Sequence, residues 1–148
     1  YTLTYTSGVI TTSQTILLQP GTASEISLPN SAAGAASGSP FTTQPIVNII
    51  DSSGNTVTSN TAPVTIAVSG GDGLATIFGT TTINAVAGVA TFSGVGISGT
   101  AATAYTLTFT SGSLTTATQT ITPTFGLPTQ ATLSTSAAGS ASGAPCAR

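Results

Sequence analysis

The sequence of 148 residues predicts an all-β protein, a sandwich or barrel of antiparallel strands. Short segments in which apolar and polar residues alternate recur along the chain, and this period of two is that of a half-buried strand. Gly, Asp, Asn and Ser gather between the segments, where turns require them. No segment shows helical periodicity. Short strands at regular spacing, with turns between them, are typical of a β-sandwich.

The first strands follow this pattern closely. "YTLTYT" places Tyr1, Leu3 and Tyr5 on one face and threonines on the other, which predicts a half-buried strand. "PIVNII" (45–50) predicts a buried strand. It runs into "DSSGN" (51–55), a turn built from Asp, Ser, Gly and Asn.

The second half of the chain supplies the remaining strands. Residues 62–73 alternate apolar side chains before a glycine-rich turn, and "ATIFGTTTINAVAG" and "VATFSGVGIS" predict further strands around Gly88. "AYTLTFTSGSLTTATQTIT" (104–122) predicts a hairpin that turns at Ser111 to Ser113. Residues 21–123 therefore supply roughly seven strands, as in a sandwich domain of about 100 residues.

The chain also repeats itself over a long period. "YTLTYTSG" at Tyr1 returns as "YTLTFTSG" at Tyr105, 104 residues later. "SAAGAASGSP" (31–40) returns as "SAAGSASGAP" (136–145), 105 residues later, and one inserted residue near Thr118 accounts for the difference. Self-similarity at a fixed period indicates a repeated structural unit. We therefore expect a tandem repeat of 104–105 residues, which is the size of one domain.

The repeat divides the chain into three parts. Residues 1–20 are predicted to be the last hairpin of a preceding repeat, residues 21–123 a complete repeat, and residues 124–148 the linker and first strand of the following repeat. The joints "LLQPGTAS" (17–24) and "TPTFGLPTQ" (122–130) occupy equivalent positions and contain Pro and Gly. Because each joint is short, neighbouring repeats are expected to lie close together.

The complete repeat resembles a known family. "TTQPIVNIIDSSGNTVTSNTAPVTIAVSGG" (42–71) and "AVAGVATFSGVGISGTAATAYTLTFTSGSLTTATQTIT" (85–122) are similar to the bacterial immunoglobulin-like repeats of giant secreted surface proteins, including the stalks of invasin- and intimin-type adhesins. The resemblance implies an immunoglobulin-like antiparallel β-sandwich and an extracellular or cell-surface location. Such repeats often serve as stalks, and the fold by itself does not specify a binding partner.

The composition excludes several classes of protein. Glu25, Asp51, Asp72 and Arg148 are the only residues with a formal charge, and Lys and His are absent. One basic residue does not provide the positive surface that nucleic-acid binding requires. No apolar run approaches the length of about 18 residues that a membrane-spanning helix needs, so membrane insertion is not expected. A surface with so few charges has little repulsion between copies, and association is therefore expected.

The same composition argues against catalysis and metal binding. Without His or Lys, none of the serines has an ordinary activating partner, so we expect no enzyme, no catalytic residues and no cofactor-binding residues. Asp51 and Asp72 lie in predicted turns, and capping of the turn explains them better than a paired-carboxylate site. Zinc sites draw on Cys and His, and calcium prefers about six to eight oxygens with several carboxylates, so no metal site is expected.

The single cysteine, Cys146, aligns with Phe41 of the complete repeat. One hypothesis is that Cys146 is a small buried apolar residue of the following sandwich. The other is that it forms a disulfide with a cysteine outside this sequence.

These observations predict a structural protein. We expect a repeat unit of an extracellular bacterial fibre, stalk or sheath that provides length and rigidity, with neighbouring repeats or identical subunits as its partners. Strand addition between separate subunits is a second route to the same fibre, although one hairpin and one strand lack the middle strands of a sandwich. The alternative function is an adhesin that binds cell surfaces or glycans through a site mostly outside this segment.

Overall fold

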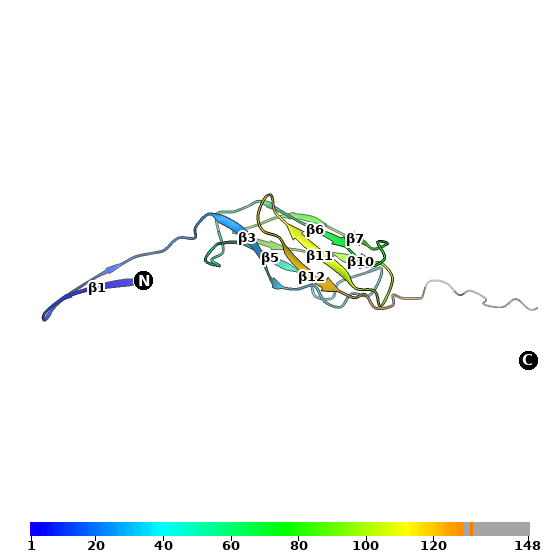
Figure 1. Cartoon of the computed structure of the whole chain (residues 1–148), viewed down its shortest axis with the longest axis horizontal. Coiled ribbons are helices and arrows are strands. Elements are labelled where there is room, and N and C mark those ends of the chain that lie inside the picture. Colours follow the sequence, from blue (N-terminus) through cyan, green and yellow to red (C-terminus); the bar gives the residue numbers. More distant parts are fainter. Residues whose placement is uncertain (129–130, 132–148) are drawn as a thin grey trace, which may run out of the picture.

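The structure is a computed structural model that describes residues 1–128 and residue 131. These residues form twelve β-strands and no helix. The strands are β1 (Thr2–Ser7), β2 (Ile10–Thr15), β3 (Ala23–Asn30), β4 (Ser39–Pro40), β5 (Ile46–Asp51), β6 (Pro63–Ser69), β7 (Thr76–Phe78), β8 (Thr82–Asn84), β9 (Val89–Thr91), β10 (Gly96–Ser98), β11 (Tyr105–Thr110) and β12 (Ala117–Ile121). β3 to β12 form one body, β1 and β2 project from one of its ends, and the chain leaves at the opposite end (Figure 1).

Three sheets build the body, and all the strand pairs within them are antiparallel. The four-stranded sheet has the order β12-β11-β6-β8, and the two three-stranded sheets have the orders β3-β5-β9 and β4-β10-β7. Side chains from all three sheets meet in one apolar core. The body is therefore a β-sandwich, and the all-β, immunoglobulin-like fold predicted from the sequence is confirmed.

The body differs from the prediction in the number of its strands. It contains ten strands, where the sequence predicted roughly seven. β7, β8, β9 and β10 have only three residues each. Gly79 and Gly94 interrupt this region with φ values of 88° and 67°, and a Cβ atom on Gly79 would overlap the Gly94 carbonyl. Because the backbone turns at these glycines, the predicted strands are divided into shorter ones.

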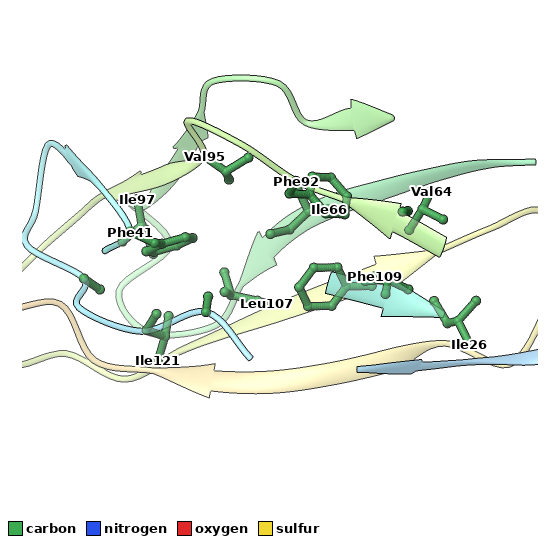
Figure 2. Packing of buried hydrophobic residues seen from close by; sticks show 14 of the residues in the cluster. Ile26, Phe41, Val64, Ile66, Phe92, Val95, Ile97, Leu107, Phe109 and Ile121 are labelled. Carbon is green, nitrogen blue, oxygen red and sulfur yellow. The ribbon is translucent and has the colours of Figure 1, made fainter. Parts of the chain in front are cut away.

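The core is organised around β11. Its side chains alternate, and Tyr105, Leu107 and Phe109 are 1%, 0% and 0% exposed. The rings of Phe109 and Phe92 meet edge to face with their centroids 6.0 Å apart (Figure 2). Such aromatic pairs contribute about 0.5–1.5 kcal/mol beyond the burial of their surface. β11 is paired on one side with β6 and on the other with β12, so its apolar face is held at the centre of the sandwich.

The alanine-, glycine- and serine-rich segment 31–40 closes one end of the body. The side chain of Gln119 on β12 accepts a hydrogen bond from Ala32 N at 2.9 Å and donates one to Ala32 O at 2.6 Å. Beyond β12, Thr124 N donates to the carbonyl of Ala35 at 2.8 Å, and Ser37 N donates to the carbonyl of Thr124 at 3.0 Å. The start and the end of the repeat are therefore joined by hydrogen bonds across nearly its whole length.

Gly70 and Gly71 provide a matched test of this packing. Both have positive φ values (78° and 59°), but a Cβ atom would have open space at Gly70 and would overlap the ring of Tyr105 at Gly71. We expect Gly70→Ala to cost about 1–2 kcal/mol for its left-handed backbone. Gly71→Ala should cost about 1–3 kcal/mol more, because it overpacks the core. Urea unfolding of the two variants measures the difference, and equal losses would contradict the close contact with Tyr105.

Candidate interaction site: the projecting hairpin and the joint

β1 and β2 form a two-stranded sheet that projects away from the body. Their register runs from Thr2↔Thr15 to Ser7↔Ile10. Two backbone hydrogen bonds between Tyr1 and Ile16, of 2.7 and 2.9 Å, extend it. All the residues of both strands are exposed. A two-stranded hairpin is marginally stable at best in water, so this one needs a covering layer.

The hairpin reproduces the register of β11 and β12. The offsets of 104 residues on the first strand and 105 on the second convert the β1–β2 pairs from Thr2↔Thr15 to Tyr5↔Thr12 into pairs of β11–β12. The corresponding pairs are Leu3↔Gln14 with Leu107↔Gln119, and Tyr5↔Thr12 with Phe109↔Ala117. The extra residue of the second copy therefore lies in the turn, between Phe109 and Ala117. Before and after the turn, the paired residues of the two hairpins correspond to each other.

The two copies differ in what surrounds them. Exposed fractions are 81%, 43% and 55% for Tyr1, Leu3 and Tyr5, whereas the equivalent residues of β11 are at most 1% exposed. The sequence predicted that Tyr1 to Thr6 form a half-buried strand, and this prediction is wrong for the described structure, because no second layer faces β1. An apolar face built for a sandwich core is thus left uncovered within the described part of the chain.

The polar side chains of the hairpin are also copies of side chains that have partners in the body. The hydroxyl of Tyr105 donates to Asp72 Oδ1 at 2.7 Å and accepts from Thr100 N at 3.0 Å. Tyr1 and Gln14 keep the residue types of Tyr105 and Gln119 but are exposed. The sequence analysis did not predict that Gln119 joins β12 to Ala32. The signal was the presence of Gln at the same place in both copies of the hairpin.

Asp51 anchors the joint between the hairpin and the body. Asp51 is 4% exposed, and its Oδ2 accepts a hydrogen bond from Gly21 N at 2.7 Å. Oδ1 accepts from the backbone of Ser53 and of Asn55, each at 2.9 Å. One carboxylate therefore forms the turn after β5 and also holds the linker against it. A hollow beside this contact is lined by Tyr1, Leu18, Gln19, Pro20 and Asn55.

The pKa values of the two turn carboxylates follow from these contacts. The N–H of Gly21, followed by the backbone and side chain of Asn55, lowers the pKa of Asp51 from 3.8 to about 2. The hydroxyl of Thr100, followed by that of Tyr105, lowers the pKa of Asp72. Both residues cap turns, as the sequence predicted. Asp51 lies beside the start of β3, which a bridge from Glu25 to Thr115 places near the start of β12. Asp72 lies beside the start of β11, which pairs with the end of β12, so the two carboxylates belong to opposite ends of the sandwich and do not form a pair.

Two further kinds of feature, clusters of metal ligands and membrane-spanning helices, are absent from the described part of the chain. No group of three or more His, Cys, Asp or Glu side chains comes together there as a metal site. None of the described residues belongs to a helix long and apolar enough to span a membrane. Cys146 and the predicted first strand of the following repeat lie outside the described residues.

Comparison with known proteins supports the β-sandwich fold. Neither a protein-family model nor a curated protein sequence matches the chain. Among solved structures, a glycosyl hydrolase family 2 member from Bacteroides cellulosilyticus is similar, with a TM-score of 0.54 and 18% identity over 78% of this chain. The β-glucuronidase of Parabacteroides merdae is also similar, with a TM-score of 0.52 and 16% identity over 76% of this chain. The match spans only 16% and 15% of those two chains.

The two copies of the hairpin allow a matched measurement of how much a covering layer contributes to the free energy of unfolding. Leu107→Ala should lower the free energy of unfolding by about 2–5 kcal/mol, because it leaves a cavity in the core. Leu3→Ala, the same substitution at the equivalent position, should change it by less than about 0.5 kcal/mol in this chain. Chemical unfolding followed by far-ultraviolet circular dichroism measures both. A large loss on Leu3→Ala would show that β1 is already covered.

The pKa of Asp51 predicts how stability depends on acid. The pKa is lowered on folding, so the contribution of this carboxylate is complete above about pH 4 and is lost as the pH falls toward 2. Unfolding temperatures should be nearly constant from about pH 4 to 9, since few other groups titrate there, and should fall below pH 4. Calorimetry of wild type and Asp51→Asn tests this, because the variant should lose part of the acid-induced fall. An identical fall in both proteins would contradict it.

Proposed function

We propose that this chain is part of a structural array in an extracellular bacterial fibre, stalk or sheath, in which immunoglobulin-like domains follow one another head to tail. The domain supplies length and rigidity, and its partners are further copies of the same domain. It acts without catalysis, a metal or a cofactor.

The observation that carries this proposal is the projecting hairpin. It has the register of β11–β12, it has their apolar face, and that face is exposed. The surface that fits such a face is the rest of a sandwich of the same kind, with the equivalent of β6 beside β1. Association through a different surface would leave Tyr1, Leu3 and Tyr5 in water, at a cost of about 25 cal/mol for each Å² of apolar area.

The arrangement of the two ends supports a linear array. The hairpin extends from one end of the body, and the chain leaves from the other (Figure 1). A preceding domain built around the hairpin would therefore lie beyond the end of the body that is opposite to where the chain leaves. Each domain in such an array contacts only its neighbours, and the length of the fibre grows with the number of domains.

A second candidate is a non-catalytic domain of a larger secreted glycosidase, and the structural comparison favours it. The similar chains are glycosidases, and this fold makes up a small part of each. The internal repeat favours the array, because a single accessory domain gives no reason for a second copy of its last hairpin.

The mass of the native polypeptide distinguishes these proposals. An array predicts, under denaturing and reducing conditions, a chain far larger than 14.3 kDa that limited proteolysis cuts into a ladder with steps of one repeat. An accessory domain predicts one domain-sized fragment and a larger fragment of different sequence. A native mass of 14.3 kDa would contradict both proposals and would favour exchange of strands between subunits.

A further inference from the structure

The internal repeat provides two views of one joint. Gly21 precedes the complete domain, and Gly126, 105 residues later, follows it at the equivalent position. Gly21 shows how the joint contacts the domain after it, and Gly126 shows how the joint contacts the domain before it. Combining the two views gives the contacts of a joint that has a domain on both sides.

On the side of the following domain, the contact is a hydrogen bond. Gly21 N donates to Asp51 Oδ2 at 2.7 Å. Oδ1 of the same carboxylate is occupied by the turn 51–55, so the acceptor is held in place whether or not a linker is present. This turn is a preformed site for the N–H group of a glycine.

On the side of the preceding domain, the contact is steric. Gly126 lies so close to the carbonyl oxygen of Ser37 that an added Cβ atom would overlap it. Ser37 is fixed by its own hydrogen bonds to Thr124 and Gly99. The glycine of the joint therefore rests directly on the closed end of the sandwich.

The residue before each glycine shows what a neighbouring domain covers. Pro20 has the body beside it, is half-buried and lines the hollow next to Asn55. Phe125 occupies the equivalent position at the other end, where no further domain is described, and is 84% exposed. A second copy placed at that end as the body is placed after Gly21 would bring its turn 51–55 over Phe125.

We propose that Phe125 and Gly126 form the docking surface for a second copy of this domain, with Gly126 N donating to that copy's Asp51. The joint glycine is then contacted on both sides, by Ser37 of the preceding domain and by Asp51 of the following one. With only a glycine between the two ends, the domains have one fixed orientation. The inference rests on the proposed array and assigns the contact that makes the array rigid.

The test uses a longer chain in which the repeat occurs twice, residues 1–126 followed by residues 22–148. Cys146 is replaced by Ser, and Thr118→Cys in both copies places spin labels on exposed, equivalent positions of β12. Pulsed electron paramagnetic resonance then measures the distance between them. One narrow distance distribution is expected. Asp51→Ala in the second copy should broaden it by about twofold, because a released joint behaves as a flexible linker.

The matched control is Asp51→Ala in the first copy. It removes the same turn contacts from a domain of the same sequence, but its carboxylate does not face the labelled joint. The distribution should therefore stay as narrow as in the unmutated chain, while both variants lower the unfolding temperature equally. A broad distribution in the unmutated chain, or equal widths for the two variants, would overturn the proposal.

This result is independent of the mass of the native protein. A narrow distribution that depends on the second copy's Asp51 would establish the joint even if the native polypeptide had only 14.3 kDa. A native array with a broad distribution would keep the proposed function and refute the fixed joint.

Discussion

The apolar face of a β-hairpin must be covered by a second layer, and the rest of this structure depends on that constraint. β11 satisfies it, because β6 lies beside it and the sheets with β5 and β10 lie over it, and its three large side chains are fully buried. β1 carries nearly the same residues in the same register and has no such layer. The contrast between two copies within one chain separates the contribution of the hairpin from that of its surroundings. Local sequence forms the hairpin, and the sandwich stabilises it.

Polar contacts in this domain are made almost without charge. Amide side chains make several of these contacts: Gln119 joins β12 to Ala32, and Gln44 both accepts a hydrogen bond from the backbone N–H of Val95 and donates one to its carbonyl. The two carboxylates that do have ordered contacts each accept several hydrogen bonds, and these contacts lower their pKa values. A carboxylate that accepts several N–H or O–H groups is stable without a cation nearby. The low charge is thus compatible with a well-ordered fold and with close contact between copies.

Much of the fold could be predicted from the sequence, because apolar and polar residues alternate clearly where a strand has one buried face. The strands within 62–73 and 104–122 were found in this way, and their burial alternates as expected. Residues 45–50 were predicted as a buried strand, and in β5 every second residue is fully buried. The division of the region 75–98 into short strands was missed, because it depends on close approach of the backbone at Gly79 and Gly94. Burial of β1 was predicted wrongly for a different reason. Alternation shows that a face is suited to burial, but only the tertiary structure shows whether a partner is present.

The projecting hairpin and the joint could also be predicted only in part. The repeat identified Tyr1 to Ile16 as a copied hairpin, and turn chemistry identified Asp51, but the bond from Asp51 to Gly21 joins residues 30 positions apart and has no sequence pattern. That bond matters for the choice between an array and exchange of strands between subunits. The hairpin needs the equivalent of β6, which lies in the middle of the repeat, and neither flanking segment of this sequence contains it. In the proposed array, a complete copy is therefore the partner that would cover the hairpin fully. With the proposed contact between Asp51 and the joint glycine, this copy would end directly against the turn 51–55, with no free linker between the two domains.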